Sequence, residues 1–162
     1  MDIKNCTPVL FVSDAKRASE FYSQVLGLTI TGDFGGLNYI FKEGFALWQI
    51  MDDNIIPRTL GMAKITNSGA TSRFELCFET PDIDSVHREL KNSGVKFLHE
   101  MNEELWGQRT VRFYDPDGHL IEVGEAMPVF LKRIFEEENG DLEATAKRTY
   151  TTPEMLAHFL NE

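Results

Sequence analysis

The chain has 162 residues, of which 42% are hydrophobic and 26% are charged. These proportions are typical of a globular domain and exclude a disordered or fibrous chain. The net charge of -10 at pH 7 argues against binding to nucleic acid or to an anionic membrane surface, because both attract basic proteins.

The amino-terminal residues lack the basic and apolar regions of a signal peptide. No apolar run approaches the ~20 residues that span a bilayer. The two cysteines, Cys6 and Cys77, form neither a CxxC motif nor a Cys–His cluster, so the sequence predicts no disulfide framework. We expect a cytoplasmic protein in which both cysteines are small buried residues.

Residues 1–51 are predicted to form a strand, a helix and three further strands. Residues 9–12 are dense in β-branched and aromatic side chains, which is typical of a strand. Asp14 is suited to cap the helix that follows, and Gly27 supplies the left-handed conformation that ends it. The remaining strands are expected just after Gly27, at residues 39–41 and at residues 45–50.

Residues 52–71 separate this module from the next one. They contain Pro57, Gly61 and Gly69 and show no clear periodicity, so we predict a linker loop. The length of this loop indicates a mobile or functional segment.

Residues 72–125 repeat the pattern of the first module. Asp82 follows Asp14 by 68 positions and Gly94 follows Gly27 by 67, so the two copies keep their register through the helix. The sequence Asp-Pro-Asp-Gly at residues 115–118 is typical of a type I turn. Strands are predicted at residues 74–78, 95–99, 110–114 and 120–123.

Residues 126–162 form a tail that is predicted to fold as three short helices. The first spans residues 128–138, Asp141 is placed to cap the second, and Pro153 begins the third. The arrangement resembles a helix-turn-helix, but residues 125–162 carry eight acidic side chains against four basic ones. We therefore expect the tail to pack on the modules or on a second subunit, not on DNA.

Two motifs carry a family resemblance that covers about residues 3–125. LFVSDAKRASEFYSQVLGL at residues 10–28 and FYDPDGHLIEVGE at residues 113–125 resemble the vicinal-oxygen-chelate superfamily, which includes glyoxalases, bleomycin-resistance proteins and extradiol dioxygenases. The resemblance implies an α+β fold, in which two tandem βαβββ modules form a cupped, incomplete barrel. It also implies a homodimer and a site for a small molecule inside the cup.

The resemblance also implies a set of metal positions, one on the first and one on the last strand of each module. In this sequence these positions hold Thr7, Trp48, Glu75 and Glu122. The two carboxylates match the family pattern, whereas threonine and tryptophan depart from it. A divalent ion such as Zn²⁺, Ni²⁺ or Mn²⁺ would then be held weakly, because tight sites need three or four protein ligands.

Arg112 offers an alternative partner for the two carboxylates. Val111 and Phe113 have the character of core residues, so strand alternation turns Arg112, Thr110 and Gln108 into the cup. The guanidinium of Arg112 would then neutralise both acids. Without such a partner, two close carboxylates have split pKa values, and one of them, Glu75 or Glu122, would serve as a catalytic base.

Further candidates for substrate binding are Trp48, His99, Trp106, Gln108 and Arg112. Aromatic residues would line the cup as a wall for a planar or apolar ligand, or would pack in the core. His99 would contribute an imidazole if its strand turns that side chain inward. The other aromatic candidates are Phe11, Tyr39 and Phe41.

Three functions are compatible with these residues. The first is a glyoxalase-like lyase or isomerase that acts on a small oxygenated substrate. The second is a protein of the bleomycin-resistance type, which binds an aromatic or cationic small molecule without chemistry. The third is a scaffold that joins protein partners through its helical tail. Binding of a divalent metal distinguishes the first from the second.

Overall fold

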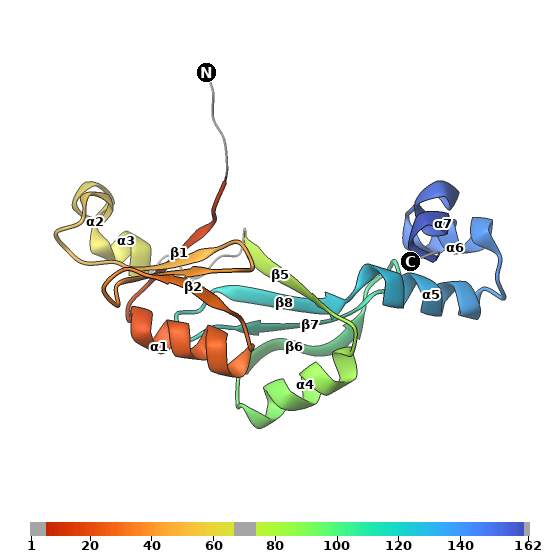
Figure 1. The fold of residues 1–162 in the computed structure, drawn as a ribbon, viewed down its shortest axis with the longest axis horizontal. Coiled ribbons are helices and arrows are strands. Elements are labelled where there is room, and N and C mark those ends of the chain that lie inside the picture. Colours follow the sequence, from red (N-terminus) through yellow and green to blue (C-terminus); the bar gives the residue numbers. More distant parts are fainter. Residues whose placement is uncertain (1–5, 67–73, 161–162) are drawn as a thin grey trace, which may run out of the picture. The chain divides into compact units, whose positions relative to one another are not determined.

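The computed structural model describes residues 6–66 and 74–160, which fold as two compact units (Figure 1). Unit 1 contains the described residues up to Phe74 together with Tyr114–Leu120. Unit 2 contains Glu75–Phe113 and the described residues from Ile121 onward. Among the described helices, none is long and apolar enough to cross a membrane.

Unit 1 is built on one mixed sheet of four strands. The strands are β1 (Val9–Val12), β2 (Ile30–Asp33), β3 (Asn38–Phe41) and β4 (Ala46–Gln49), and they lie in the order β1-β4-β3-β2. β1 runs parallel to β4, whereas β4, β3 and β2 are successively antiparallel. β1 is therefore an edge strand, and its predicted position at residues 9–12 is confirmed.

A helix packs on one face of this sheet. The helix α1 (Ala15–Glu20) begins at Asp14, whose carboxylate accepts the N–H of Arg17, and continues as the π-helical turn η1 (Phe21–Val25). Leu10, Val12 and Leu47 are buried beneath it, together with the rings of Tyr22, Phe41 and Phe45. Phe41 is thus a core residue and not part of a ligand-binding wall.

The linker forms two short helices where the sequence predicted a loop. These are α2 (Ile55–Leu60) and α3 (Met62–Thr66). Pro57 is compatible with α2 because it lies in the first turn, where the missing N–H has no intrahelical partner. Gly61, with φ of +85°, ends α2. Residues 67–71 of the predicted linker lie outside the described residues.

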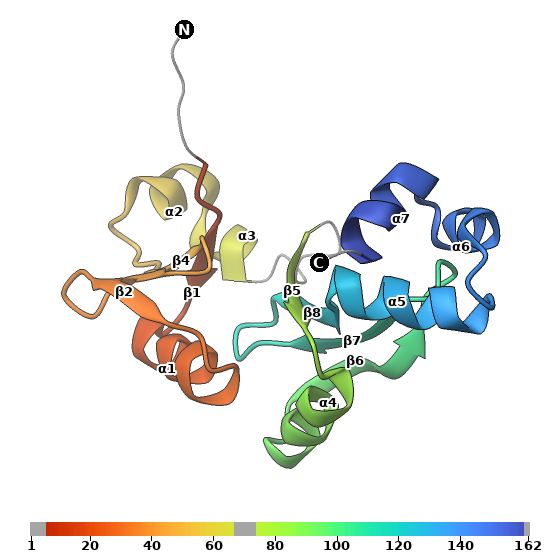
Figure 2. The same cartoon turned by 45° about the vertical axis from the view of Figure 1, so that its right-hand side comes forward.

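Unit 2 repeats the sheet of unit 1. Its strands β5 (Glu75–Thr80), β6 (Lys96–Glu103), β7 (Arg109–Tyr114) and β8 (Leu120–Glu125) lie in the order β5-β8-β7-β6, which is equivalent to the order in unit 1. The helix α4 (Ile83–Asn92) is capped by Asp82 and lies along one face of the sheet (Figures 1 and 2). The predicted tandem βαβββ modules are confirmed.

The core of unit 2 lies between α4 and the sheet. Val111 and Phe113 of β7, and Ile121 and Val123 of β8, alternate with more exposed residues. Since successive side chains of a strand point to opposite faces, the residues between them face away from α4. This alternation places Arg112 and Glu122 on the helix-free face.

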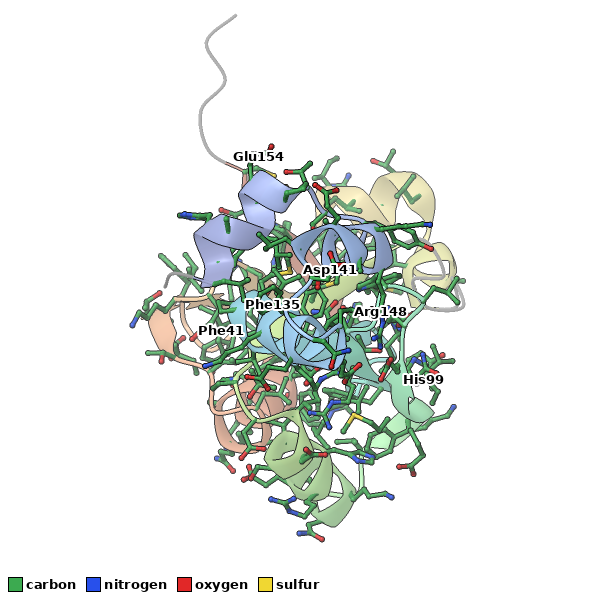
Figure 3. All side chains as sticks on the ribbon, turned by 90° about the vertical axis from the view of Figure 1, so that its right-hand side faces the viewer. Phe41, His99, Phe135, Asp141, Arg148 and Glu154 are labelled. Carbon is green, nitrogen blue, oxygen red and sulfur yellow. The ribbon has the colours of Figure 1, made fainter. Side chains whose placement is uncertain are left out.

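The tail consists of α5 (Met127–Glu137), α6 (Leu142–Thr149) and α7 (Pro153–Leu160). Figure 3 shows Phe135 on α5, Asp141 at the start of α6 and Glu154 on α7. Asp141 accepts the N–H of Ala144, as expected for a cap. α5 and α7 share a buried core, against which Trp106 of the β6–β7 turn also packs. The core residues are Phe130, Leu131, Ile134 and Leu156.

Candidate functional site

Arg112 is the centre of a charged cluster on the helix-free face of the unit 2 sheet. Its Nε donates to Glu75 Oε2 at 3.0 Å, and its Nη1 donates to Glu104 Oε1 at 2.6 Å. Its Nη2 forms an ion pair with Glu122. We call these four residues, together with His99, the Arg112 cluster.

Strand order explains how residues from distant parts of the sequence meet here. Glu75 lies on the edge strand β5, Glu122 on its neighbour β8, and Arg112 on β7. The guanidinium therefore crosses β8 to reach Glu75. Glu104 comes from the turn between β6 and β7, where its backbone N–H donates to the Gln108 carbonyl at 2.9 Å. The hairpin thus returns Glu104 to the side of Arg112.

His99 lies against the guanidinium of Arg112. Its Nε2 is 3.2 Å from Nη1 of Arg112, and its Nδ1 is 2.7 Å from the carbonyl oxygen of Glu100. A guanidinium only donates hydrogen bonds, so Nε2 is the acceptor and Nδ1 carries the proton. In this geometry His99 accepts a hydrogen bond from Arg112 and helps to position the guanidinium.

The inward direction of His99 depends on an irregularity in β6. Phe97 packs edge-on against His87 of α4, and Glu100 forms ion pairs with His87 and Lys91 of the same helix. Two residues three positions apart thus face α4, which regular alternation does not allow. The interruption leaves His99 on the opposite face, beside Arg112.

The carboxylates of the cluster differ in their electrostatic surroundings. Burial raises the pKa of Glu122, and the charges of Glu75 and Glu104 add to this effect, while Arg112 opposes it. Burial also acts on Glu104, but hydrogen bonds from Arg112 and Thr110 outweigh it and lower the pKa of that carboxyl group. Glu122 therefore holds a proton more readily than Glu104.

The pKa of the Arg112 guanidinium is raised well above its ordinary value. Burial opposes its charge, but hydrogen bonds to Glu104 and Glu75 and the charge of Glu122 more than compensate. Arg112 is consequently a permanent cation. Three carboxylates around one guanidinium leave the group with two net negative charges.

Cys77 lies beside the cluster and is exposed, as is Cys6, so the prediction that both cysteines are buried is wrong. Cys77 lies on the edge strand β5, two residues from Glu75 and two from Glu79, so these three side chains share one face of the strand. Ligand atoms of Glu75, Cys77 and Glu122 lie within 4.8 Å of one another, a spacing compatible with a metal ion. The thiol is still partly shielded from water. This partial burial and the charges of Glu122 and Glu75 raise the pKa of the Cys77 thiol to about 11, which disfavours the thiolate that metals bind.

The residues at the family's metal positions do not fit a divalent ion as they stand. The carboxylates of Glu75 and Glu122 are already bound to Arg112. Trp48, in unit 1, packs edge-on against Phe11 with ring centroids 5.9 Å apart, and an indole N–H donates only. Thr7 is exposed. A metal ion would have to displace a cation that the protein itself supplies.

Trp106 and Gln108, both predicted to bind substrate, take part in a different contact. Nε1 of Trp106 donates to Oε1 of Gln108 at 3.1 Å, and Nε2 of Gln108 donates to the carbonyl of Glu125 at 2.8 Å. Trp106 also packs on the tail core. Of the predicted binding residues in the described part of unit 2, the structure brings His99 to Arg112, whereas Trp106 and Gln108 join β7 to the tail.

Unit 1 contains a pocket of about 400 Å³ beside the edge strand β1. Its walls are mainly apolar, and the exposed Val9 and the partly buried Phe11 come from the face of β1 opposite α1. This volume lies in the usual range for small-molecule sites. The pocket is lined by residues 8–11 with Ile65, Phe74 and His119.

His119 is held in the pocket wall by a buried polar chain. Tyr22 donates its hydroxyl to Asp115 Oδ2 at 2.8 Å, and the same oxygen is 2.8 Å from Nδ1 of His119. Burial opposes protonation of His119, but the hydrogen bond and charge of Asp115 outweigh it and raise the pKa of the imidazole. The turn at residues 115–118 is confirmed, since Gly118 N–H donates to the Asp115 carbonyl at 3.0 Å.

Sequence reasoning missed Glu104 and the place of His119 in the pocket. Glu104 stands in a polar turn without periodicity, and only a hairpin centred between residues 104 and 108 would have placed it opposite Gln108 and near Arg112. His119 directly follows the Asp-Pro-Asp-Gly turn in the sequence. Its position next to an edge strand depends on tertiary packing and leaves no local signal.

Comparison with known proteins agrees with this architecture. The family described as a glyoxalase-like domain matches residues 5–128. YraH, an uncharacterised protein of Bacillus subtilis strain 168, is 32% identical over 117 residues, which cover 70% of this chain and 91% of YraH.

Solved structures show the same fold. A protein of unknown function from Agrobacterium tumefaciens strain C58 is 34% identical with a TM-score of 0.66, covering 78% of this chain and 97% of that one. A lactoylglutathione lyase from Agrobacterium tumefaciens, at 24% identity and a TM-score of 0.55, covers 76% of this chain and 93% of its own. The chain therefore belongs to the glyoxalase-like domain family.

Proposed function

We propose that this protein binds a small aromatic or apolar molecule without chemical conversion, in the manner of the bleomycin-resistance members of its superfamily. The observation that carries the proposal is the pairing of Glu75 and Glu122 with Arg112. Both carboxylates already contact the guanidinium, so neither is free to coordinate a metal ion. The two residues best placed for catalysis are thus engaged in structure.

The pocket of unit 1 supports binding. Phe11 and Phe74 offer aromatic surface, and Val9 and Ile65 offer aliphatic surface. Burial of such surface drives binding at roughly 25 cal/mol per Å². The net charge of -10 favours a ligand that is neutral or cationic over one that is anionic. A planar organic cation combines both preferences.

Isothermal calorimetry with proflavine, a planar cation, tests this proposal. We expect saturable binding to the wild-type protein and about tenfold weaker binding to Phe11→Ala, which removes aromatic surface from the pocket. Phe34→Ala is the matched control, because Phe34 is 63% exposed and does not line the pocket. Equal affinities of all three proteins, or no saturable heat, would contradict the proposal.

A second candidate function is a metal-independent lyase or isomerase that uses Glu122 as its base. It is favoured by the raised pKa of that carboxyl group, since a base works best when its pKa approaches the working pH. The test follows lactoylglutathione formation from methylglyoxal and glutathione. Turnover that disappears in Glu122→Gln would establish the enzyme, whereas absence of turnover in the wild type leaves the binding function in place.

A further inference from the structure

We infer that the guanidinium of Arg112 permanently takes the place of a divalent metal ion, so that this chain contains a latent metal site closed by its own side chain. The inference extends the proposed function, because it gives the reason why Glu75 and Glu122 perform no metal chemistry. It concerns unit 2 alone and is tested independently of the pocket in unit 1.

Three acidic side chains contact the guanidinium of Arg112. Three carboxylates from three separate segments converge on one guanidinium, with Glu75 at 3.0 Å from Nε and Glu104 at 2.6 Å from Nη1, and with Glu122 on Nη2. Each acid contacts a different nitrogen of the guanidinium. The side chain of Arg112 is only 18% exposed, which limits competition from water.

The side chains around the guanidinium carry atoms that can bind a metal ion. Carboxylate oxygens and imidazole nitrogens are donors that Zn²⁺ and Mn²⁺ bind, and Nε2 of His99 lies 3.2 Å from Nη1. Two of the three acids, Glu75 and Glu122, have ligand atoms within 4.8 Å of each other and of Cys77. These three ligand atoms are close enough to contact one ion, and the guanidinium holds the two carboxylates among them.

The charge of the cluster also favours a cation at the position of the guanidinium. With Arg112 the three acids retain two net negative charges, and without it all three would repel one another in a partly buried site. A divalent ion is the natural replacement, because it neutralises more charge than a guanidinium and occupies less volume. Removing the arginine should therefore convert the cluster into a metal site.

The experiment measures metal binding to the full-length wild type and to Arg112→Met, which keeps the apolar stem and removes the charge. Zn²⁺ and Mn²⁺ are titrated calorimetrically, and melting temperature is recorded with and without metal. We expect no stoichiometric binding to the wild type. Arg112→Met should bind one ion on the order of a hundredfold more tightly and melt at a higher temperature with metal.

Two further variants locate the ion. The double variant Arg112→Met/Glu122→Gln should lose the acquired site. Arg109→Met is the matched control, because Arg109 lies on the same strand but pairs with Glu125 and Asp84, and it should acquire no site that depends on Glu122.

If Arg112→Met does not fold without metal, Arg112→Gln is used, because its amide can still donate to the carboxylates while carrying no charge. Stoichiometric binding to the wild type that is lost in Glu75→Gln would overturn the inference. So would a folded Arg112→Met or Arg112→Gln protein that binds neither Zn²⁺ nor Mn²⁺.

Discussion

Arg109 and Arg112 stand three positions apart on β7 and hold different carboxylates. Arg109 pairs with Glu125 at 2.7 Å and with Asp84 of α4 at 3.2 Å, whereas Arg112 holds the acids of the helix-free face. Arg133 of α5 adds a second contact to Glu125 at 2.7 Å. Glu125, whose side chain is only 1% exposed, thus joins the sheet to the tail.

Glu125→Gln should lower the free energy of unfolding by about 3 kcal/mol. The substitution removes the buried carboxylate that Arg109 and Arg133 share, so both arginines lose an ion-pair partner. Urea denaturation at pH 7 measures this change. Glu100→Gln is the control, since Glu100 is an exposed acid that is also ion-paired, and it should have little effect. Equal effects of the two substitutions would show that Glu125 makes no special contribution.

The effect of Glu125 should depend on pH. Burial acts to raise its pKa, but hydrogen bonds from Arg133 and Arg109 outweigh burial and lower the pKa of this carboxyl group below its ordinary 4.5. A lowered pKa in the folded state stabilises the protein fully above the unfolded value and is lost as the pH falls through the folded one. The difference between wild type and Glu125→Gln should therefore narrow below about pH 4.5.

The sequence predicted some of these residues and missed others for physical reasons. Alternation around Val111 and Phe113 was enough to expect Arg112 on the face opposite the core. Its contacts with Glu75 and Glu122 agree with the expectation that the guanidinium neutralises both acids. The burial of Glu125 could not be anticipated, because it depends on the tail helix α5. This helix brings Arg133, eight positions further along the chain, into contact with Glu125.

Among the elements, the helix starts follow local chemistry most closely. Asp14, Asp82 and Asp141 each accept an amide N–H three residues ahead, at 2.9 to 3.0 Å, as an N-cap requires. The π-helical turn and the helices of the linker left no comparable signal. The π-helical turn depends on how the chain leaves α1, and the linker helices depend on how the chain continues past Pro57.

Gly107 tests how closely the β6–β7 turn packs on the tail. Its φ is +95°, and an added Cβ would lie 2.8 Å from Cδ1 of the buried Ile134. Gly107→Ala should therefore cost about 3 kcal/mol, from backbone strain and overpacking together. Thermal or urea unfolding measures the loss.

Gly27→Ala is the matched control for this prediction. Gly27 also has a positive φ, of +68°, but nothing lies within 4 Å of its added Cβ. The control should cost about 1 kcal/mol from strain alone. If both variants lose the same stability, the turn does not pack tightly against α5.

The molecule as a whole is a duplicated module with an added helical tail. The duplication was readable because caps and exit glycines recur at nearly constant spacing, and the two sheets have equivalent strand orders. The mode of tail attachment was not readable, because it depends on Gln108, Glu125 and Arg133 meeting across three elements. The same contrast applies to function. The repeated module identifies the family, whereas individual side chains on each sheet determine the chemistry.

The two tryptophans of the chain are divided between the units: Trp48 of β4 packs edge-on against Phe11 in unit 1, and Trp106 packs on the tail core in unit 2. Each half therefore contains its own intrinsic fluorophore. In Trp48→Phe the emission reports only on the tail and its sheet, and in Trp106→Phe only on the amino-terminal half. Stopped-flow traces of the two variants resolve the order in which the halves unfold, without any external label.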